Sequence, residues 1–427
     1  MAESRTFTFY GRTWDHINTS DSDDRFVQRW FLNALGTRLS ENGHQFQEAV
    51  TPAPNNVIHI LDLGDNIEDD RAFKRKSKKT FVVGIAFGVE GQLPDDQEQI
   101  LSVLYRRLIR IAANAVMAII IPGQNIDFNA VPPQGNWKAY TVAPESPGLG
   151  VHEISSDDFQ SFMDQIYERL APILNSTLAI DYSYRPSLPI HLFRGNDRTL
   201  RLAWLAHQIS DLDLLPAPYK ARDLEQIAQK SDLRRIERLF GVGALSYGYF
   251  AVREPGIGHW TSISGIDKSS MTGIPERDVT LIAGYDQSNG TVIACSSIFF
   301  WIGQQIRVRF PSWIAQALGI GMPRRPSVES YEQWLIFKEF PDVNVIVHFH
   351  GWWRNESEMA ITQSHYPCAT KEAALEVVRA LGQVADPTAG AIGIPWHGIV
   401  VTDSSVVRII KRIQDCYLKY TPLRQTT

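Results

Sequence analysis

The sequence predicts an α/β protein with two domains, an open α/β domain over residues 1–190 and a second α/β domain over residues 191–427. Short apolar runs typical of buried strands alternate with segments whose apolar residues recur at helical spacing. The chain is 427 residues long, whereas single cores stop growing at roughly 250–300 residues. The stretch Arg185-Pro186-Ser187-Leu188-Pro189 has the composition of a domain boundary.

Strands and helices alternate through the first domain. The pattern predicts strands at Arg5–Tyr10, Val57–Leu63, Thr80–Phe87, Met117–Ile121 and Ala139–Val142, and helices at Asp24–Leu39, Glu98–Ala115 and about Asp157–Ile173. The last of these helices begins in a cluster of serine and aspartate that can cap its N-terminus. No glycine-rich phosphate loop follows any of these strands, so we expect no nucleotide site there.

The second domain has a different pattern. Helices are expected at Thr199–Leu212, Arg222–Leu239 and Val406–Tyr417. Between Tyr247 and Phe300 the pattern changes to short strands broken by glycine and serine.

Composition excludes several classes of function. Hydrophobic residues make up 44% and charged residues 21%, as in soluble globular proteins. The formal net charge of -5 argues against nucleic acid or an anionic membrane as the main partner. The most apolar stretch, Ile111–Ile121, has about half the length of a membrane span. With three cysteines and no secretory leader in view, we expect a soluble protein of the reducing cytoplasm.

Three histidines form the pattern of a metal site. His348 and His350 end a β-branched run that predicts a strand, on which side chains at positions i and i+2 share a face. His397 precedes Gly398 at the start of a second apolar strand, where a residue without a side chain leaves room for a ligand. Neutral imidazoles at this spacing suit one divalent ion. Zn²⁺ is the first expectation, with Mn²⁺, Fe²⁺, Co²⁺ and Ni²⁺ as alternatives.

Other residues stand in a fixed order around these histidines. Along the chain they read Ser264-Gly265, Glu329, His348 and His350, Tyr366-Pro367 with Thr370-Lys371-Glu372, and His397-Gly398, with Glu329 nineteen positions before His348. This order resembles the class II aldolase/adducin family over about residues 200–420. The chain also looks like a subfamily with an extra N-terminal α/β domain.

The resemblance implies a fold and an assembly. The second domain would be a class II aldolase-like α/β/α domain with a central, mainly antiparallel sheet. The chain would form a homo-oligomer, a tetramer in most of the family, with the site between subunits. Tyr417 or Tyr420 would then reach a neighbouring site, and the sequence does not choose between them.

The resemblance also assigns the chemistry. Glu329 would be the catalytic acid/base, and the nearby Glu332 lies three residues too late. Tyr366 is the candidate second acid, although a turn residue packed beside the site fits it equally well. The metal would bind a carbonyl and a hydroxyl of the substrate and stabilise the enediolate that forms when the bond breaks.

The substrate-binding positions depart from the phosphate-binding members of the family. Ser264 and Gly265 are retained, as is Ser327, but Gly248 is followed by Tyr249 where those members have asparagine. Several donors for a phosphate are therefore missing. Lys268, or a pair of surface arginines at Arg324 and Arg325, could supply charge in their place.

We therefore expect a metal-dependent aldolase-type lyase or a related dehydratase of carbohydrate metabolism. Its substrate would be a small polyhydroxy carbonyl compound, either a sugar or a sugar phosphate. A sugar-phosphate epimerase with the same site is the first alternative. A non-catalytic interaction protein like the adducins is the second, but those have lost the metal ligands that are present here.

Overall fold

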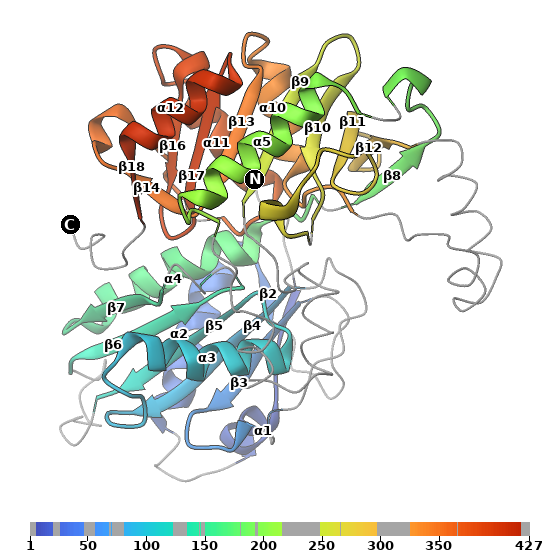
Figure 1. Cartoon of the computed structure of the whole chain (residues 1–427). Coiled ribbons are helices and arrows are strands. Elements are labelled where there is room, and N and C mark those ends of the chain that lie inside the picture. The colour runs from blue at the N-terminus through green and yellow to red at the C-terminus, as the bar shows by residue number, and fades with distance from the viewer. Residues whose placement is uncertain are drawn as a thin grey trace. The chain divides into compact units, whose positions relative to one another are not determined.

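The computed structural model describes most of the chain in two compact units. The described residues are 6–19, 26–46, 56–67, 70, 81–122, 135–144, 146, 150–179, 181–192, 195–215, 248–264, 266–296, 325–364 and 366–419. Among them the first unit ends at Ser176 and the second begins at Thr177. Each unit is a sheet with helices packed on it, which confirms the expected α/β fold class (Figure 1).

The first unit contains a seven-stranded sheet of order β2-β1-β3-β4-β5-β6-β7. From β2 to β5 the strands pair in parallel, and β6 and β7 extend the sheet in antiparallel fashion. The central strands are buried along almost their whole length, as in sheets covered on both faces. The strands are β1 Thr6–Tyr10, β2 Gln45–Phe46, β3 Asn56–Asp62, β4 Phe81–Val89, β5 Ala115–Ile121, β6 Trp137–Val142 and β7 His152–Ser156.

The helices of the first unit are α1 Arg12–Thr19, α2 Phe26–Glu41, α3 Gln97–Ile111 and α4 Phe159–Asn175. The expected strands and helices of this unit are confirmed, whereas α1, β2 and β7 were not expected. The Asp158 carboxylate accepts a hydrogen bond from the Ser161 amide and caps α4, in the cluster where a cap was expected. In α3, the buried Arg107 pairs with the carboxylate of Asp70 at 2.8 Å.

The second unit contains a nine-stranded sheet of order β15-β16-β17-β13-β9-β10-β11-β12-β8. All neighbours are antiparallel except the pairs β15–β16 and β12–β8, so the expected mainly antiparallel sheet is confirmed. Because β8 pairs with β12, this unit begins before residue 191, where the second domain was expected to start. The strands are β8 Tyr182–Arg185, β9 Tyr249–Glu254, β10 Gly258–Ser262, β11 Val279–Asp286, β12 Thr291–Cys295, β13 Val345–Phe349, β15 Ala360–Ile361, β16 Ala391–Ile394 and β17 Gly398–Asp403.

Helices cover both faces of this sheet. On one face, α5 (Asp197–Asp211) and α12 (Val406–Cys416) pack into the larger core cluster. On the other face, α10 (Ser330–Glu339) and α11 (Lys371–Leu381) pack into a second cluster. Alternate residues of β13 enter the two clusters, since Val345 and Val347 lie in the first and Ile346 lies in the second. His348 therefore faces the side of α10 and α11.

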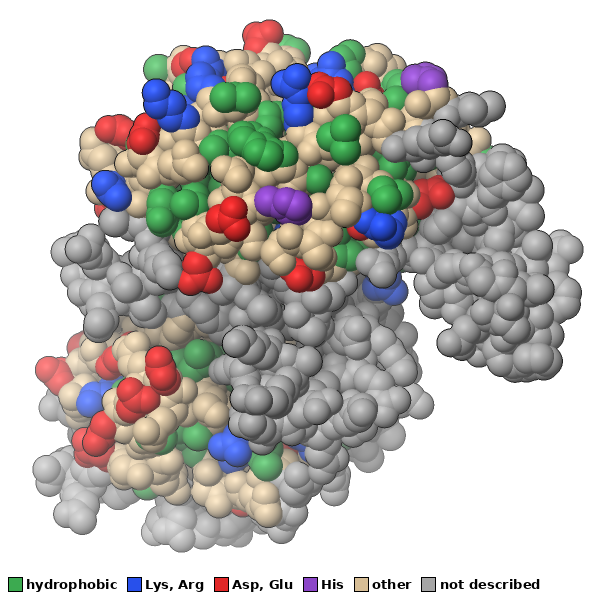
Figure 2. Space-filling view, in the orientation of Figure 1, with side chains coloured by type: hydrophobic (Ala, Val, Ile, Leu, Met, Phe, Trp, Pro, Cys, Tyr) green, Lys and Arg blue, Asp and Glu red, His purple; other side chains and the backbone are tan. Residues whose placement is uncertain are grey.

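The remaining described elements of the second unit are short. They are the 3-10 turns Ile190–Leu192, Lys268–Ser270, Glu356–Glu358 and Pro387–Ala389, and a separate pair of strands, β14 (Gly351–Trp353) and β18 (Tyr417–Lys419). The helix expected at Arg222–Leu239 lies outside the described residues. Two large apolar side chains of α5, Leu200 and Trp204, are exposed, and hydrophobic side chains gather over this helix in Figure 2.

None of the helices in the described part of the chain is both long enough and apolar enough to span a membrane.

Candidate active site

The three histidines singled out in the sequence come together. His348 lies in β13, His350 directly follows that strand, and His397 directly precedes β17, the neighbouring strand of the sheet. Each offers a ring nitrogen, and these nitrogens lie within 4.8 Å of one another. All three side chains are buried. Antiparallel pairing of β13 with β17 thus brings residues that are far apart in the sequence together, where β13 ends and β17 begins.

Close backbone packing around these histidines depends on glycine. Gly398 has a φ of +148°, and a Cβ atom there would lie 2.4 Å from the carbonyl oxygen of Phe349. Gly248 has a φ of +85°, and its Cβ atom would lie 2.3 Å from the carbonyl oxygen of His348. Other residues would clash at both positions. Gly248, expected to bind substrate, therefore has a packing role directly behind His348.

The orientation of His348 suits a metal ligand. Its Nδ1 donates to the carbonyl oxygen of Ile399 at 3.0 Å, which leaves Nε2 as the available lone pair. This Nε2 is buried and has no hydrogen-bond partner among the described residues. An orphaned nitrogen beside two further imidazoles fits a divalent ion, because burying it without a partner is costly.

The environment keeps these imidazoles neutral. Burial lowers the pKa of His348 and His350 well below the ordinary value, with a further contribution from the neighbouring rings. Burial lowers the pKa of His397 to about 4. Neutral imidazole is the form that binds metal, so no proton has to leave these rings near neutral pH.

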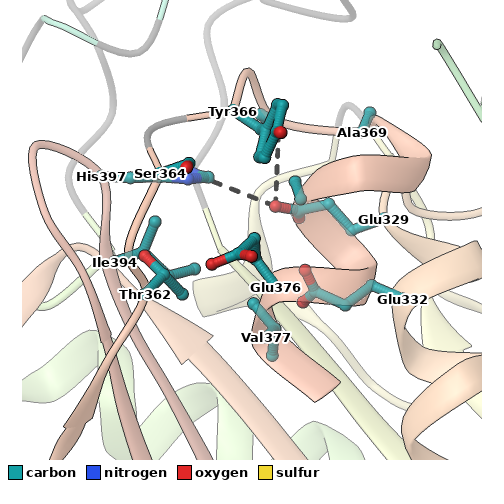
Figure 3. A pocket seen from close by; sticks show the side chains of 12 residues that line it. Glu329, Glu332, Thr362, Ser364, Tyr366, Ala369, Glu376, Val377, Ile394 and His397 are labelled. Carbon is teal, nitrogen blue, oxygen red and sulfur yellow. Dashed lines mark hydrogen bonds and ion pairs between the residues drawn. The ribbon is translucent and has the colours of Figure 1, made fainter. Parts of the chain in front are cut away.

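Glu329 lies beside the histidines at the N-terminal end of α10. Its side chain is buried, and its Oε1 lies 3.8 Å from Nε2 of His348 and 3.9 Å from Nε2 of His397. The thiol of Cys368 donates to the same oxygen at 3.3 Å. Figure 3 shows Glu329 pointing toward His397 across the pocket. The structure therefore places the carboxylate of Glu329 beside the imidazoles of His348 and His397.

Glu332, the other glutamate considered as the base, forms its hydrogen bond with a different residue. Its Oε1 accepts a hydrogen bond from the hydroxyl of Tyr249, which is fully buried in β9. Burial, followed by the charge of Glu329, raises the pKa of Glu332 to about 8.

A pocket opens beside these groups. Its lining residues are Glu329, Glu332, Thr362, Ser364, Tyr366, Cys368, Ala369, Ala373, Glu376, Val377, Ile394 and His397. Tyr366 is thus in the pocket, where burial, with the charges of Glu376 and Glu372, raises its pKa. The pocket joins the expected base, one expected ligand and the expected second acid.

The expected substrate-binding residues are placed differently. Ser327 positions Glu329, because its Oγ accepts the Glu329 amide at 3.4 Å. The Ser264 amide donates to the carbonyl oxygen of Arg325, and Lys268 is buried. Neither serine nor Lys268 lines the described pocket. Burial lowers the pKa of Lys268 to about 8, against the charges of Glu329 and Asp267.

Gly265, Arg324, His365 and Tyr420 lie outside the described residues. Tyr417 begins β18 and packs beside the larger core cluster.

Four residues of this region were missed by sequence reasoning. The three cysteines are scattered along the sequence, so nothing indicated that Cys368 belongs to the site, although it lies in the turn that begins with Tyr366. Tyr249, Ser364 and Glu376 come from separate elements that meet only in the fold. Cys368 could have been found from its place between Tyr366 and the helix start at Thr370.

Comparison with solved structures finds similar chains among aldolases. An L-fuculose 1-phosphate aldolase is 14% identical with a TM-score of 0.31, over 52% of this chain and 84% of that chain. The corresponding enzyme from Thermus thermophilus is 14% identical with a TM-score of 0.29, over 51% and 89%. A sugar-phosphate aldolase from Thermotoga maritima is 12% identical with a TM-score of 0.30, over 51% and 89%.

No protein-family model matches this chain, and no curated protein matches it. TM-scores near 0.3 do not establish its family. Its function is therefore inferred from the residues of the site.

Proposed function

We propose that this protein is a metal-dependent lyase of the aldolase type that acts on a small polyhydroxy carbonyl compound. One observation carries the proposal: the buried Nε2 of His348, which has no hydrogen-bond partner among the described residues, lies close to two further imidazoles and to the carboxylate of Glu329. Three neutral nitrogen ligands leave coordination positions open, which is a feature of catalytic rather than structural metal sites.

His348, His350 and His397 would hold the ion. When bound, it would act as a Lewis acid for a substrate carbonyl and offset the negative charge that develops on oxygen as a bond breaks. Zinc remains our first choice. Imidazole ligands also suit other divalent metals, and the residues of the site do not select one of them.

Glu329 would move the proton. Its Oε1 faces two of the imidazoles and also the pocket, so a substrate held at the histidines would lie within its reach. The Cys368 thiol would hold this oxygen in place through its hydrogen bond. Tyr366, in the wall of the same pocket, would return a proton to the departing oxygen.

Other parts of the expected biology belong to this proposal. We propose a cytoplasmic homo-oligomer, with a tetramer as the expected state, and an accessory role for the first unit without a nucleotide. Light scattering of the purified chain tests the first point. A thermal-shift screen with nucleotides tests the second, because a shift would contradict it.

The activity is tested by loading the full chain with Zn²⁺, Mn²⁺, Fe²⁺, Co²⁺ or Ni²⁺ and screening sugar phosphates, free ketoses and hydroxy acids for a released aldehyde or keto product. Epimerisation is detected in the same samples by chromatography of the sugars. His397→Ala should abolish any activity found, whereas the exposed His191→Ala should retain it. A protein that binds no metal would instead fit a non-catalytic interaction role.

A further inference from the structure

Among the described residues, the walls of the pocket carry many oxygen atoms, and their only basic side chain is the imidazole of His397. Among the twelve described lining residues, Glu329, Glu332 and Glu376 supply carboxyl groups, and Thr362, Ser364 and Tyr366 supply hydroxyls. No lysine or arginine belongs to this set of described residues. Phosphate recognition ordinarily needs positive charge together with several N–H or O–H donors.

Arg379 contacts a lining residue of the pocket, but its guanidinium group is already paired with a carboxylate. Arg379 donates to both carboxylate oxygens of Glu376, at 3.2 and 2.8 Å. The Glu376 carboxylate also accepts the amide of Gln363 at 3.1 Å. Because Glu376 lines the pocket and Arg379 does not, the pair presents its acidic member to a ligand. Lys268, the other basic candidate, is buried outside the lining.

Tyr249 fixes the position of Glu332. The tyrosine is fully buried in β9, and its hydroxyl donates to one oxygen of this carboxyl group, which lines the pocket from α10. Glu332 cannot turn away into solvent, because it too is buried. Ionised or protonated, it brings no positive charge to an anion, whereas both forms accept a hydrogen bond from a substrate hydroxyl.

We propose that the substrate is an unphosphorylated polyhydroxy compound, and that Glu332, positioned by Tyr249, is a specificity-determining residue that binds one of its hydroxyls. This inference rests on the proposed function, since it takes the histidines as the place where the carbonyl end binds. The hydroxyl-bearing end would then lie along Glu332 and the Thr362 and Ser364 wall. A terminal phosphate would meet the carboxyl groups of the glutamates there, and no lysine or arginine among the described lining residues.

The test uses a matched pair of metal-chelating probes on the Zn²⁺-loaded full chain. One probe is the hydroxamate of a tetronic acid, and the other is the same molecule with a terminal phosphate. Isothermal titration calorimetry gives both dissociation constants. We expect the unphosphorylated probe to bind at least about tenfold more tightly, because like charges disfavour the other. Equal affinity, or tighter binding of the phosphorylated probe, would overturn the inference.

Two variants locate the effect. Glu332→Leu removes the acceptor and should weaken the unphosphorylated probe by about tenfold, the effect of one hydrogen bond to a polar ligand, while metal content stays unchanged. Tyr249→Phe keeps the carboxyl group but frees it, and should weaken the same probe by a smaller factor. Unchanged affinity in Glu332→Leu would contradict the role of Glu332.

Failure of the proposed function would look different. If the chain binds Zn²⁺ but neither hydroxamate, the ion is not accessible to a ligand, and the lyase proposal itself is overturned together with the inference. If both probes bind and only the order of affinities is wrong, the metal site stands and the substrate class is refuted.

Discussion

Oε1 of Glu329 lies 3.8 Å from Nε2 of His348. The nitrogen has no hydrogen-bond partner among the described residues, and the oxygen is shared with the thiol of Cys368. A carboxylate and a lone pair that face each other in a buried place repel unless a cation or a proton stands between them. We propose that a divalent ion lies beside this nitrogen and that Glu329 is the base next to it.

Replacing Glu329 tests the base directly. Glu329→Gln keeps the shape of the side chain but removes the proton acceptor, so kcat should fall by about 100- to 10,000-fold. Metal content should stay near that of the wild type, because the three histidines remain. The measurement is turnover at full metal occupancy, with metal content determined on the same sample.

Glu332→Gln is the matched control on the same helix. It retains an acceptor for the hydroxyl of Tyr249 in place of the carboxyl oxygen and should keep kcat within about tenfold of the wild type. Loss of turnover in Glu332→Gln with retention in Glu329→Gln would mean that the roles of the two residues have been exchanged.

Cys368 should act through Glu329 rather than on the substrate. Cys368→Ala removes the donor to Oε1 and should lower kcat by about three- to tenfold, since a thiol is a weak donor. Cys368→Ser restores a donor and should recover most of the loss. The measurement is kcat and KM of both variants, and we expect the change in kcat with little change in KM. A purely structural defect would not be rescued by serine.

Gly398 should be required for the packing of the backbone beside the three histidines. Gly398→Ala places a Cβ atom 2.4 Å from the carbonyl oxygen of Phe349, so we expect a loss of about 1–3 kcal/mol in stability and weaker metal binding. Gly284→Ala in β11 is the control, because its nearest neighbour, Nε1 of Trp334, lies at 4.0 Å. Thermal unfolding and metal titration of both variants test this, and equal behaviour would refute it.

The first unit should lose stability as pH rises from about 4 to about 6. Burial raises the pKa of Asp70 from 3.8 to about 6 despite its pairing with Arg107. The folded chain then binds more protons at Asp70 than the unfolded chain between these values, so the stabilising contribution of this group is full below about pH 4 and is lost as the pH rises through the folded pKa. The shift corresponds to at most about 3 kcal/mol.

Asp70→Asn isolates this contribution. The difference in melting temperature between wild type and variant should change between pH 4 and pH 6 and stay constant above that window. A difference that is flat across the whole range would show that Asp70 titrates normally.

The sequence predicted the elements with strong periodicity. In β3 and β4, continuous apolar runs indicated buried strands, and the burial of both confirms this. β7 was missed because His152–Ser156 is short, polar and at the edge of the sheet, so it carries no apolar alternation to detect. The link from β8 to β12 was missed because pairing between distant strands leaves no local pattern.

At the site, the sequence predicted residue types better than contacts. The spacing of His348 and His350 follows from strand geometry, so their shared site could be expected. The hydrogen bonds from Cys368 to Glu329 and from Tyr249 to Glu332 join separate elements and required the fold. Lys268 was expected to bind substrate because of its charge, whereas the structure buries it outside the pocket lining, where its charge interacts with that of Glu329.

The central claim is tested most directly by elemental analysis of the reconstituted full chain, beside the variant in which His348, His350 and His397 are all replaced by alanine. The account predicts about one divalent ion per wild-type chain, held by three neutral imidazoles, and almost none in the variant. Less than about a tenth of an ion per wild-type chain, or equal content in both proteins, would contradict it.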